Sequence, residues 1–318
     1  MASAPATSKS DSATAVRHKP AIEMLSLVKR YGSISALDGL TMSVPRGEIF
    51  GFLGPNGAGK TTAVKLLLGL SHPTSGEGAV LGAPFGDLDA RRRIGYLPEL
   101  FRYQDWLSAR EVLDLHCKLL GLARAQRDRE IDEALQAVGL SARADDRVGG
   151  FSKGMQQRLG LGVALLGKPE LVILDEPTSA LDPVGRYDVR EIIVAIKQRG
   201  ATVFLNSHLL TEVEKVCERV AIVDHGRIVE VGGLDELLRG DLVRVRLSSP
   251  LTAELQTLLE QYGRAAHKDG WITLSGVDLA RIPDLVEQLV RSGARVQAVE
   301  QTRSTLEERF LEVLDEDA

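Results

Sequence analysis

The sequence contains few cysteines, the residues that stabilise a fold through disulfide bonds or bound zinc. Among its 318 residues there are only two cysteines, Cys117 and Cys217, and no CxxC pair. Two cysteines cannot form the disulfide framework of a small secreted domain, and their spacing does not match a zinc site. We therefore interpret both as reduced thiols that pack as small apolar side chains, as is typical of a protein in a reducing cytoplasm.

Long apolar runs are also missing. The longest stretch without Asp, Glu, Lys or Arg is 200–211, twelve residues that include His208. A membrane-spanning helix needs about 20 mostly apolar residues, so we expect any membrane span to belong to another chain. Residues 1–20 are rich in Ala and Ser and lack the apolar block of a signal peptide. We expect this segment to be a disordered leader.

An excess of positive charge is the third missing feature. The chain carries 44 acidic and 39 basic side chains, and its net charge is −5. Residues 241–318 alone hold 14 acidic and 9 basic residues, so the whole acidic excess lies in this tail. A protein that grips phosphate backbones usually has a net basic domain, and we therefore expect no nucleic-acid partner. With 44% hydrophobic and 26% charged residues, the composition is that of an ordinary globular protein.

Between residues 21 and 240, short apolar runs alternate with stretches of helical spacing. The apolar runs predict strands at 22–28, 49–53, within 91–97, and at 171–174, 203–206 and 220–223. The helical spacing predicts helices at 61–70, 108–120, 129–138, 187–197 and 209–218. Apolar strands that alternate with helices predict an α/β fold, with a parallel sheet covered on both faces.

The pattern changes near Gly240. The remaining sequence predicts strands at 243–247, 271–274 and 296–301, and helices at 252–262, 282–292 and 305–314. We interpret 241–318 as a small α+β domain with the element order βαββαβα. It contains no catalytic cluster, and we interpret His267 and Trp271 as packing residues. We expect the domain to stabilise a dimer or to have a regulatory role.

A glycine-rich turn follows the strand expected at 49–53. Its sequence, Gly54-Pro55-Asn56-Gly57-Ala58-Gly59-Lys60-Thr61, matches G-x-x-x-x-G-K-[ST] and precedes an expected helix. Glycines let backbone N–H groups wrap round phosphates, and the helix N-terminus adds positive charge. Lys60 can reach the β- and γ-phosphates, and the Thr61 hydroxyl can ligate Mg²⁺. We expect seven residues to contact the nucleotide: Asn56, Gly57, Ala58, Gly59, Lys60, Thr61 and Thr62.

A second signal comes from the strand at 171–174, which is followed by Asp175 and Glu176. Neighbouring side chains on a strand point to opposite faces, so the two carboxylates can take separate roles. Asp175 would hold Mg²⁺, and Glu176 would polarise an attacking water. Taken alone, the pair could also be a solvated acidic strand end. The glycine-rich turn by itself does not choose between a kinase, a GTPase and an ATPase.

Three segments, in their order along the chain, resemble the ATP-binding cassette (ABC) ATPases. They are the glycine-rich turn, the segment Phe151-Ser152-Lys153-Gly154-Met155-Gln156-Gln157-Arg158, and the run Leu174-Asp175-Glu176-Pro177-Thr178-Ser179-Ala180-Leu181-Asp182-Pro183. The resemblance covers about residues 22–240. It implies a P-loop ATPase fold in which the mostly parallel core sheet is joined by an antiparallel β part and by a helical subdomain at about 100–165. In this family two cassettes pack head to tail around two ATP molecules with Mg²⁺, so the implied partner is a second copy of the chain.

The resemblance also implies roles for residues outside the turn. Ser152 and Gly154 match the signature segment, which contacts the γ-phosphate held by the other cassette. Asp182 matches the D-loop at the dimer interface, His208 matches the switch histidine near the γ-phosphate, and Tyr31 matches the aromatic residue that stacks on adenine. On its own, a histidine after a strand is more often structural, and Tyr31 could be an ordinary packing tyrosine.

Two residues depart from the family pattern. The signature usually reads Leu-Ser-Gly-Gly-Gln, whereas here Lys153 brings a cation close to the phosphates. Glu99 stands where the family commonly has glutamine; its carboxylate can still ligate Mg²⁺ but repels phosphate oxygens. Both departures resemble those found in a branch of export ATPases for drugs, antibiotics and polysaccharides. Members of this branch often carry a small C-terminal domain.

The resemblance therefore implies the ATPase subunit of a membrane exporter that acts with a separate transmembrane permease. Its place would be cytoplasmic, on the inner face of the cell membrane. The segment 101–106 has three aromatic residues among charges, which suits either docking to the permease or a packed aromatic cluster. Two alternatives stay open: a soluble ABC ATPase that acts on ribosomes or DNA, and a regulator that binds nucleotide without turnover. The single phosphate loop and the lack of basic excess argue against the first, and Glu176 argues against the second.

Overall fold

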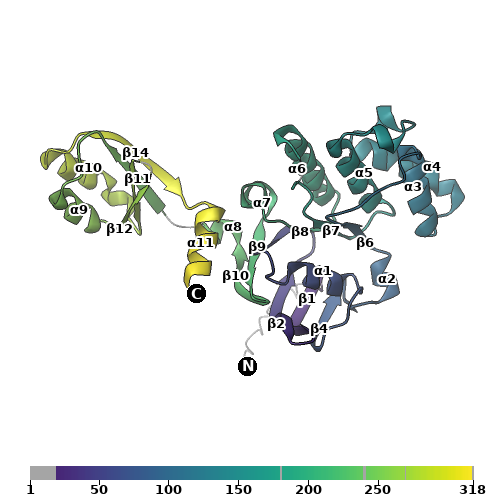
Figure 1. The fold of residues 1–318 in the computed structure, drawn as a ribbon. Coiled ribbons are helices and arrows are strands. Elements are labelled where there is room, and N and C mark those ends of the chain that lie inside the picture. Colours follow the sequence, from purple (N-terminus) through teal and green to yellow (C-terminus); the bar gives the residue numbers. More distant parts are fainter. Residues whose placement is uncertain (1–18, 180, 239–240, 269, 317–318) are drawn as a thin grey trace, which may run out of the picture.

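The computed structural model describes residues 19–316 except for 180, 239–240 and 269 (Figure 1). The leader expected at 1–20 lies outside the described residues, apart from Lys19 and Pro20. Cys117 and Cys217 are buried free thiols, as expected, and burial raises the pKa of both. In the described part of the chain, no helix combines the length and the apolar character needed to cross a membrane.

The centre of the fold is a six-stranded sheet in the order β10-β9-β3-β8-β7-β6. Its strands are β3 (Ile49–Leu53), β6 (Ile94–Leu97), β7 (Leu171–Asp175), β8 (Thr202–Asn206), β9 (Arg219–Asp224) and β10 (Arg227–Gly233). All neighbours are parallel except β10, which runs antiparallel to β9. Every residue of β3, β7 and β8 is buried, which explains why these strands are continuous apolar runs in the sequence.

A second sheet is antiparallel, in the order β2-β1-β4-β5. It contains β1 (Ile22–Tyr31), β2 (Ile34–Val44), β4 (Ser75–Val80) and β5 (Ala83–Pro84). Apolar side chains of this sheet share one buried cluster with Phe50, Phe52 and Phe204 of the central sheet. Of this sheet, the sequence predicted only the strand at 22–28, which is most of β1; the glycine-rich β4 has no alternating apolar pattern that would have marked it.

Among the described residues from 19 to 238 there are eight α-helices. They are α1 (Lys60–Leu67), α2 (Leu88–Arg91), α3 (Ala109–Leu119), α4 (Arg124–Ala137), α5 (Lys153–Leu165), α6 (Pro183–Gln198), α7 (Leu210–Val216) and α8 (Leu234–Leu237). Helices α3, α4 and α5 lie between β6 and β7 in the chain and gather beyond the β6 edge of the sheet (Figure 1). Helix α3 begins where predicted because Ser108 and Glu111 form a reciprocal capping box.

The last part of the described chain forms a third sheet in the order β12-β13-β11-β14. Its elements are β11 (Asp241–Leu247), α9 (Ala253–Glu260), β12 (Arg264–Lys268), β13 (Trp271–Ser275), α10 (Ile282–Arg291), β14 (Val296–Arg303) and α11 (Leu306–Glu316). This is the predicted order βαββαβα, and β12 is the strand for which the sequence supplied no range. Strands β11–β14 and helices α9 and α10 share their own apolar cluster. Helix α11 instead packs against α7 and β10 (Figure 1).

Candidate functional site

Three adjacent strands end at one edge of the central sheet, and each is followed by predicted site residues. Strand β3 leads into the glycine-rich turn, β7 ends at Asp175, and β8 ends at Asn206. Asp175 and Asn206 are register partners, and Asn206 is also the partner of Phe52 in β3. Because the strands are parallel, their carboxyl ends meet, and segments that are distant in sequence form one site.

The glycine-rich turn needs its glycines for conformation and for space. Gly57 and Gly59 have positive φ values of 87° and 101°. A Cβ atom on Gly59 would lie 2.3 Å from the carbonyl oxygen of Ala36, and one on Gly54 would lie 2.2 Å from that of Val223. The turn is therefore held closely between β2 and β9, and its backbone N–H groups are presented at the start of α1.

Lys60 is the buried cation of this turn. Its Nζ donates to the carbonyl oxygens of Gly54, at 2.6 Å, and Pro55, at 3.0 Å. The side chain is 8% exposed. Burial lowers the pKa of Lys60, against the opposing effect of Glu176, Asp175 and Glu99. A phosphate would offer the ammonium group stronger acceptors than these two carbonyls.

Asp175 and Glu176 form the acidic part of the site. Burial raises the pKa of Asp175, and the Glu99 and Glu176 carboxylates add to this effect, while a hydrogen bond from Asn206 Nδ2 at 2.5 Å opposes it. Glu176 has a left-handed backbone, with φ at 51°, which turns the chain sharply at the end of β7. This strained conformation is held by its N–H, which donates to the carbonyl oxygen of Asn206 at 2.8 Å.

The side chains of Glu176 and His208 face each other across the site. His208 Nδ1 lies 2.8 Å from Glu176 Oε2, but not in hydrogen-bond geometry, and this buried oxygen has no hydrogen-bond partner among the described residues. His208 remains half exposed, whereas Glu176 is 9% exposed. The pair is thus a nearly buried acceptor beside an accessible imidazole, which is a suitable arrangement for orienting a water molecule.

Asn206 is a site residue for which sequence analysis proposed no role. Its Nδ2 is bonded to Asp175, and its buried Oδ1 has no hydrogen-bond partner. The available signal was a polar residue at the end of an otherwise apolar strand. Gly226 was missed as well: its N–H donates to the carbonyl oxygen of Ala58 at 3.0 Å, so the β9–β10 turn supports the phosphate loop.

Glu99 lies on the loop after β6 and is exposed. Burial, together with the charges of Asp175 and Glu99, raises the pKa of Tyr96 to about 12, which indicates that Glu99 acts at the same sheet edge. In the following segment, two of the three aromatic residues form a packed cluster, one of the two alternatives that the sequence left open. The rings of Phe101 and Tyr103 contact each other at a tilt of 50°, with centroids 5.3 Å apart, and pack against the core, whereas Trp106 is 70% exposed.

The signature residues do not meet the phosphate loop within one chain. Helix α5 runs antiparallel to β6, since Gly160 packs against Leu97 at the strand's end and Ala164 against Gly95 nearer its start. The start of α5, with Ser152 and Gly154, therefore projects beyond the carboxyl end of β6. Strand β6 is three strands away from β3, a lateral distance of about 14 Å at the usual strand spacing.

Ser152 and Asp182 cap helices. Ser152 Oγ accepts from the N–H of Met155 at 3.2 Å at the start of α5. Asp182 Oδ1 accepts from the N–H of Gly185 at 2.8 Å at the start of α6. Both side chains are on exposed residues, and each lies beside the free N–H groups of a helix N-terminus.

The remaining predicted contacts lie at the rim of the site. Thr61 is exposed and Thr62 is half-buried in the first turn of α1. Tyr31 ends β1 and is 47% exposed, with Lys29 Nζ 4.9 Å from its ring centroid. The β1–β2 turn leads directly to Ala36, whose carbonyl lies against the phosphate loop, so Tyr31 stands near that loop.

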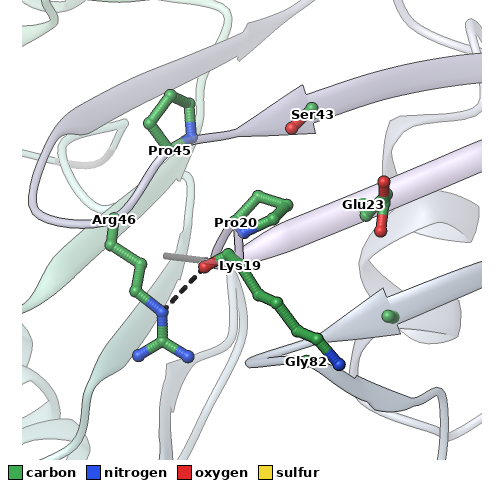
Figure 2. A pocket seen from close by; sticks show the side chains of 8 residues that line it. Lys19, Pro20, Glu23, Ser43, Pro45, Arg46 and Gly82 are labelled. Carbon is green, nitrogen blue, oxygen red and sulfur yellow. Dashed lines mark hydrogen bonds between the residues drawn. The ribbon is translucent and has the colours of Figure 1, made fainter. Parts of the chain in front are cut away.

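A depression elsewhere on the surface contains none of these residues. Figure 2 shows its lining from the start of β1, the end of β2 and the β4–β5 turn, with Arg46 Nε donating to the carbonyl oxygen of Lys19 at 3.0 Å. Gly82 and Glu23 lie on its other side. The chemistry-bearing residues are thus concentrated at the carboxyl edge of the central sheet, and not in this depression.

Comparison with known proteins identifies the family. A family model described as ABC transporter matches residues 37–179. The bacitracin transport ATP-binding protein BcrA of Bacillus licheniformis is 36% identical over 92% of this chain and 97% of its own length. The Nod factor export ATP-binding protein I of Burkholderia thailandensis is 34% identical over 81% of this chain and 86% of its own length.

A solved structure has the same fold. The ATP-binding subunit of an ABC transporter is 33% identical and covers 69% of this chain and 92% of its own length, with a TM-score of 0.62. The match thus extends over most of the chain at the level of backbone geometry, in addition to the sequence identity with the bacitracin relative. The chain therefore belongs to the ABC transporter ATP-binding proteins, a family of ATPases coupled to transport.

Proposed function

We propose that the protein is the ATP-hydrolysing subunit of an exporter. The observation that carries this proposal is the convergence of Lys60, Asp175, Glu176 and His208 at one sheet edge, with Glu176 Oε2 buried and without a hydrogen-bond partner. A buried acceptor beside a phosphate loop suits the activation of a water molecule for phosphoryl transfer. The names of the bacitracin and Nod factor relatives support transport, and the latter supports export.

Each site residue has a proposed role in hydrolysis. The loop N–H groups from Asn56 to Thr62 and the ammonium group of Lys60 bind the phosphates, and Tyr31 stacks on the adenine. Glu176 accepts a proton from the attacking water, and His208 contacts the γ-phosphate and orients the Glu176 carboxylate. This assignment is supported by the 2.8 Å approach of His208 Nδ1 to the nearly buried Glu176 carboxylate and by the charge interaction between Glu176 and Lys60.

The oxygen ligands at the site suit Mg²⁺. This ion usually takes one or two carboxylates and completes its shell with phosphate oxygens and water. Asp175 and Thr61 are the proposed ligands, with Glu99 from the loop after β6. The raised pKa of Asp175 fits, since it marks a carboxylate whose negative charge lacks compensation. Bound there, Mg²⁺ would neutralise charge on the β- and γ-phosphates.

The position of the signature segment supports a head-to-tail homodimer. Ser152 and Gly154 lie on the far side of the site edge from the phosphate loop, so a second copy must supply them to the bound nucleotide. Asp182, exposed beside β7, would line the same interface. Each dimer would then close over two ATP molecules, with each signature helix presenting its N-terminus to the γ-phosphate.

The proposal includes a separate transmembrane permease, with this subunit on the cytoplasmic face of the membrane. Exposed Leu100 and Trp106, which follow Glu99, offer an apolar contact beside the Mg²⁺ ligands. The proposed division of labour places ATP turnover in residues 21–240, with the helical part at about 100–165 towards the permease. Residues 241–318 would form a second domain.

A matched pair of variants tests the catalytic assignment. Glu176 and Glu170 flank the same strand, β7, at its two ends. Glu176→Gln should bind ATP as tightly as the wild type, lose about 100-fold or more of its turnover, and accumulate as an ATP-bound dimer in size-exclusion chromatography. Glu170→Gln should retain turnover. Hydrolysis by Glu176→Gln at the wild-type rate would remove this residue from the role of base.

Affinity capture from detergent-solubilised native membranes tests the exporter assignment. The expected result is a polytopic membrane protein in stoichiometric amount. Recovery of ribosomal proteins or DNA without a membrane chain would instead favour a soluble ABC ATPase. This outcome would leave the hydrolytic site unchanged but would overturn the transport part of the proposal.

A further inference from the structure

The last helix of the chain belongs spatially to the catalytic part. Helix α11 follows β14 after only Ser304 and Thr305, yet it packs on α7 and β10. Leu306 is fully buried, and Phe310 packs against the same cluster as Val213 of α7. The sheet β11–β14 is thus attached to the catalytic part through α11 as well as through the segment after α8 (Figure 1).

The start of α11 is fixed by a capping box. Thr305 Oγ1 accepts from the N–H of Glu308 at 3.2 Å, and the N–H of Thr305 donates to Glu308 Oε2 at 2.9 Å. These reciprocal hydrogen bonds hold the two-residue link from β14 in one conformation. We therefore expect α11 to move together with the C-terminal sheet β11–β14.

Two polar contacts join α11 to the catalytic part. The N–H of Leu306 donates to Glu214 Oε2 of α7 at 3.0 Å. Arg309 binds Glu230 of β10 in a bidentate manner, with Nε to Oε2 at 3.0 Å and Nη2 to Oε1 at 2.7 Å. Both side chains of this pair are less than a third exposed, so the interaction is stronger than an ordinary surface ion pair.

The two elements that α11 joins are held in different ways, and α7 is itself anchored by the fully buried Val213 and by the ion pair of Glu212 with Arg190. Strand β10 pairs with β9 along its length, and Gly226 in the turn before it is hydrogen-bonded to Ala58 of the phosphate loop. Helix α7 has only seven residues, and no side chain caps its N-terminus. It begins two residues after His208, so any shift of α7 moves the imidazole that faces Glu176.

We propose that Arg309 is a positioning residue for ATP hydrolysis: through α11 it ties α7 to the fixed strand β10 and so holds His208 in register with Glu176. This inference rests on the hydrolytic role proposed above for that pair. Residues 241–318 could then affect the catalytic site without contacting a second copy of the chain, because their sheet is linked to α11.

Steady-state ATPase kinetics of the full chain test the positioning role. Arg309→Gln and Glu230→Gln should each lower kcat about fivefold while leaving KM for ATP and the ATP dissociation constant within about twofold. The double variant should be no slower than either single variant, because both changes remove the same interaction. Arg309→Lys, which keeps the charge, should recover part of kcat.

Arg303→Gln is the matched control. Arg303 ends β14 just before α11 and faces Asp235 at 3.7 Å, but both side chains are more than 80% exposed, so no change in kcat is expected. An unchanged kcat in Arg309→Gln, or effects of the two single variants that multiply, would overturn the positioning role. A wild-type chain without ATPase activity would instead contradict the proposed function. Equal losses in kcat and in ATP affinity would show general loosening of the fold and would also reject the inference.

Discussion

The two edges of the central sheet both carry carboxylates, but these are compensated in different ways. At the amino edge, Glu48, Glu170 and Glu218 stand directly before β3, β7 and β9. At the carboxyl edge stand Asp175 and Glu176. The first group has basic partners drawn from the chain itself, whereas the second has only the buried Lys60 and the half-exposed His208 close by.

The amino edge is largely a structural network. Glu170 accepts from Arg46 at 2.6 Å and from Arg93 at 2.8 Å, and the two guanidinium groups hold its pKa below the usual range. Glu218 pairs with Lys197. Arg46 also donates to the carbonyl of Lys19, so this network continues into the second sheet (Figure 2). These contacts connect strand ends that are distant in sequence.

The carboxyl edge is incomplete in itself. Glu176 Oε2 and Asn206 Oδ1 are buried without hydrogen-bond partners, and burial raises the pKa of Asp175. Such groups destabilise the free protein and gain most from a ligand that brings cations and hydrogen-bond donors. The comparison therefore separates residues that stabilise the fold from residues that are arranged for a ligand, and the two kinds of residue should respond differently to substitution.

The largest expected effect is at the carboxyl edge. Lys60→Ala should weaken ATP binding roughly 100-fold, because a charge-assisted contact to the phosphates is lost. The midpoint of thermal unfolding without nucleotide should change little, since burial already disfavours the charged form of Lys60. Isothermal titration with ATP measures the first quantity and calorimetry the second. Unaltered ATP affinity would contradict the assignment of this turn as the phosphate loop.

A smaller effect is expected from Glu48, the exception at the amino edge. Its Oε1 has no hydrogen-bond partner, Arg219 Nε lies 3.7 Å away, and burial raises the pKa of Glu48 to about 7. Because the folded pKa is above the unfolded one, stability falls as pH rises from about 4.5 towards 7. Glu48→Gln should therefore be more stable than the wild type at pH 8 by about 2 kcal/mol, with no gain near pH 4.

Urea unfolding at the two pH values measures this difference. The exposed Glu77→Gln serves as the control and should give the same small change at both pH values. A Glu48→Gln variant that is less stable than the wild type at pH 8 would show that the ionised carboxylate is compensated, as its neighbours at this edge are. In that case all three carboxylates at the amino edge would be compensated, and the amino edge would differ from the carboxyl edge without exception.

The smallest effect is expected from Glu170→Gln. This substitution should lower the free energy of unfolding, whereas Glu48→Gln should raise it. The two arginines depress the pKa of Glu170, so its contribution to stability is present at neutral pH and is lost as pH falls. Because the side chain is 41% exposed, the loss at pH 7 should be only about 1 kcal/mol. Urea unfolding at pH 7 and pH 3 measures it. A loss that persists at pH 3 would trace the effect to packing and not to the ion pairs.

Local patterns were sufficient for much of the fold. The apolar runs that became β7 and β8 were recognisable because both faces of these strands are buried, and α3 was recognisable from the helical spacing of 108–120. The strands β4 and β12 were not assigned, since β4 is rich in glycine and β12 has only a short, weakly apolar segment. Strand β4 is stabilised by pairing with the distant β1, and β12 by pairing with β13; neither pairing is visible in the local apolar pattern of the strand.

The candidate site shows the same division. Local sequence patterns were enough to identify Lys60, from the glycine spacing of the turn, and Asp175 and Glu176, from their place at the end of an apolar strand. They did not indicate the bond between Asn206 and Asp175 or the support of Ala58 by Gly226, which join separate strands. Sequence also left open whether Phe101 and Tyr103 form a surface, and packing against the core decided it.

The sequence by itself therefore determined the family and much of the order of the elements, and it predicted the residues of the phosphate loop, because these depend on short-range spacing and conformation. The tertiary structure decided which carboxylates are neutralised and which are left for a ligand, because that depends on burial and on partners far along the chain. It also decided that α11 packs beside α7. The amphipathic spacing of 305–314 predicted a buried face, but only the folded chain shows which elements cover it.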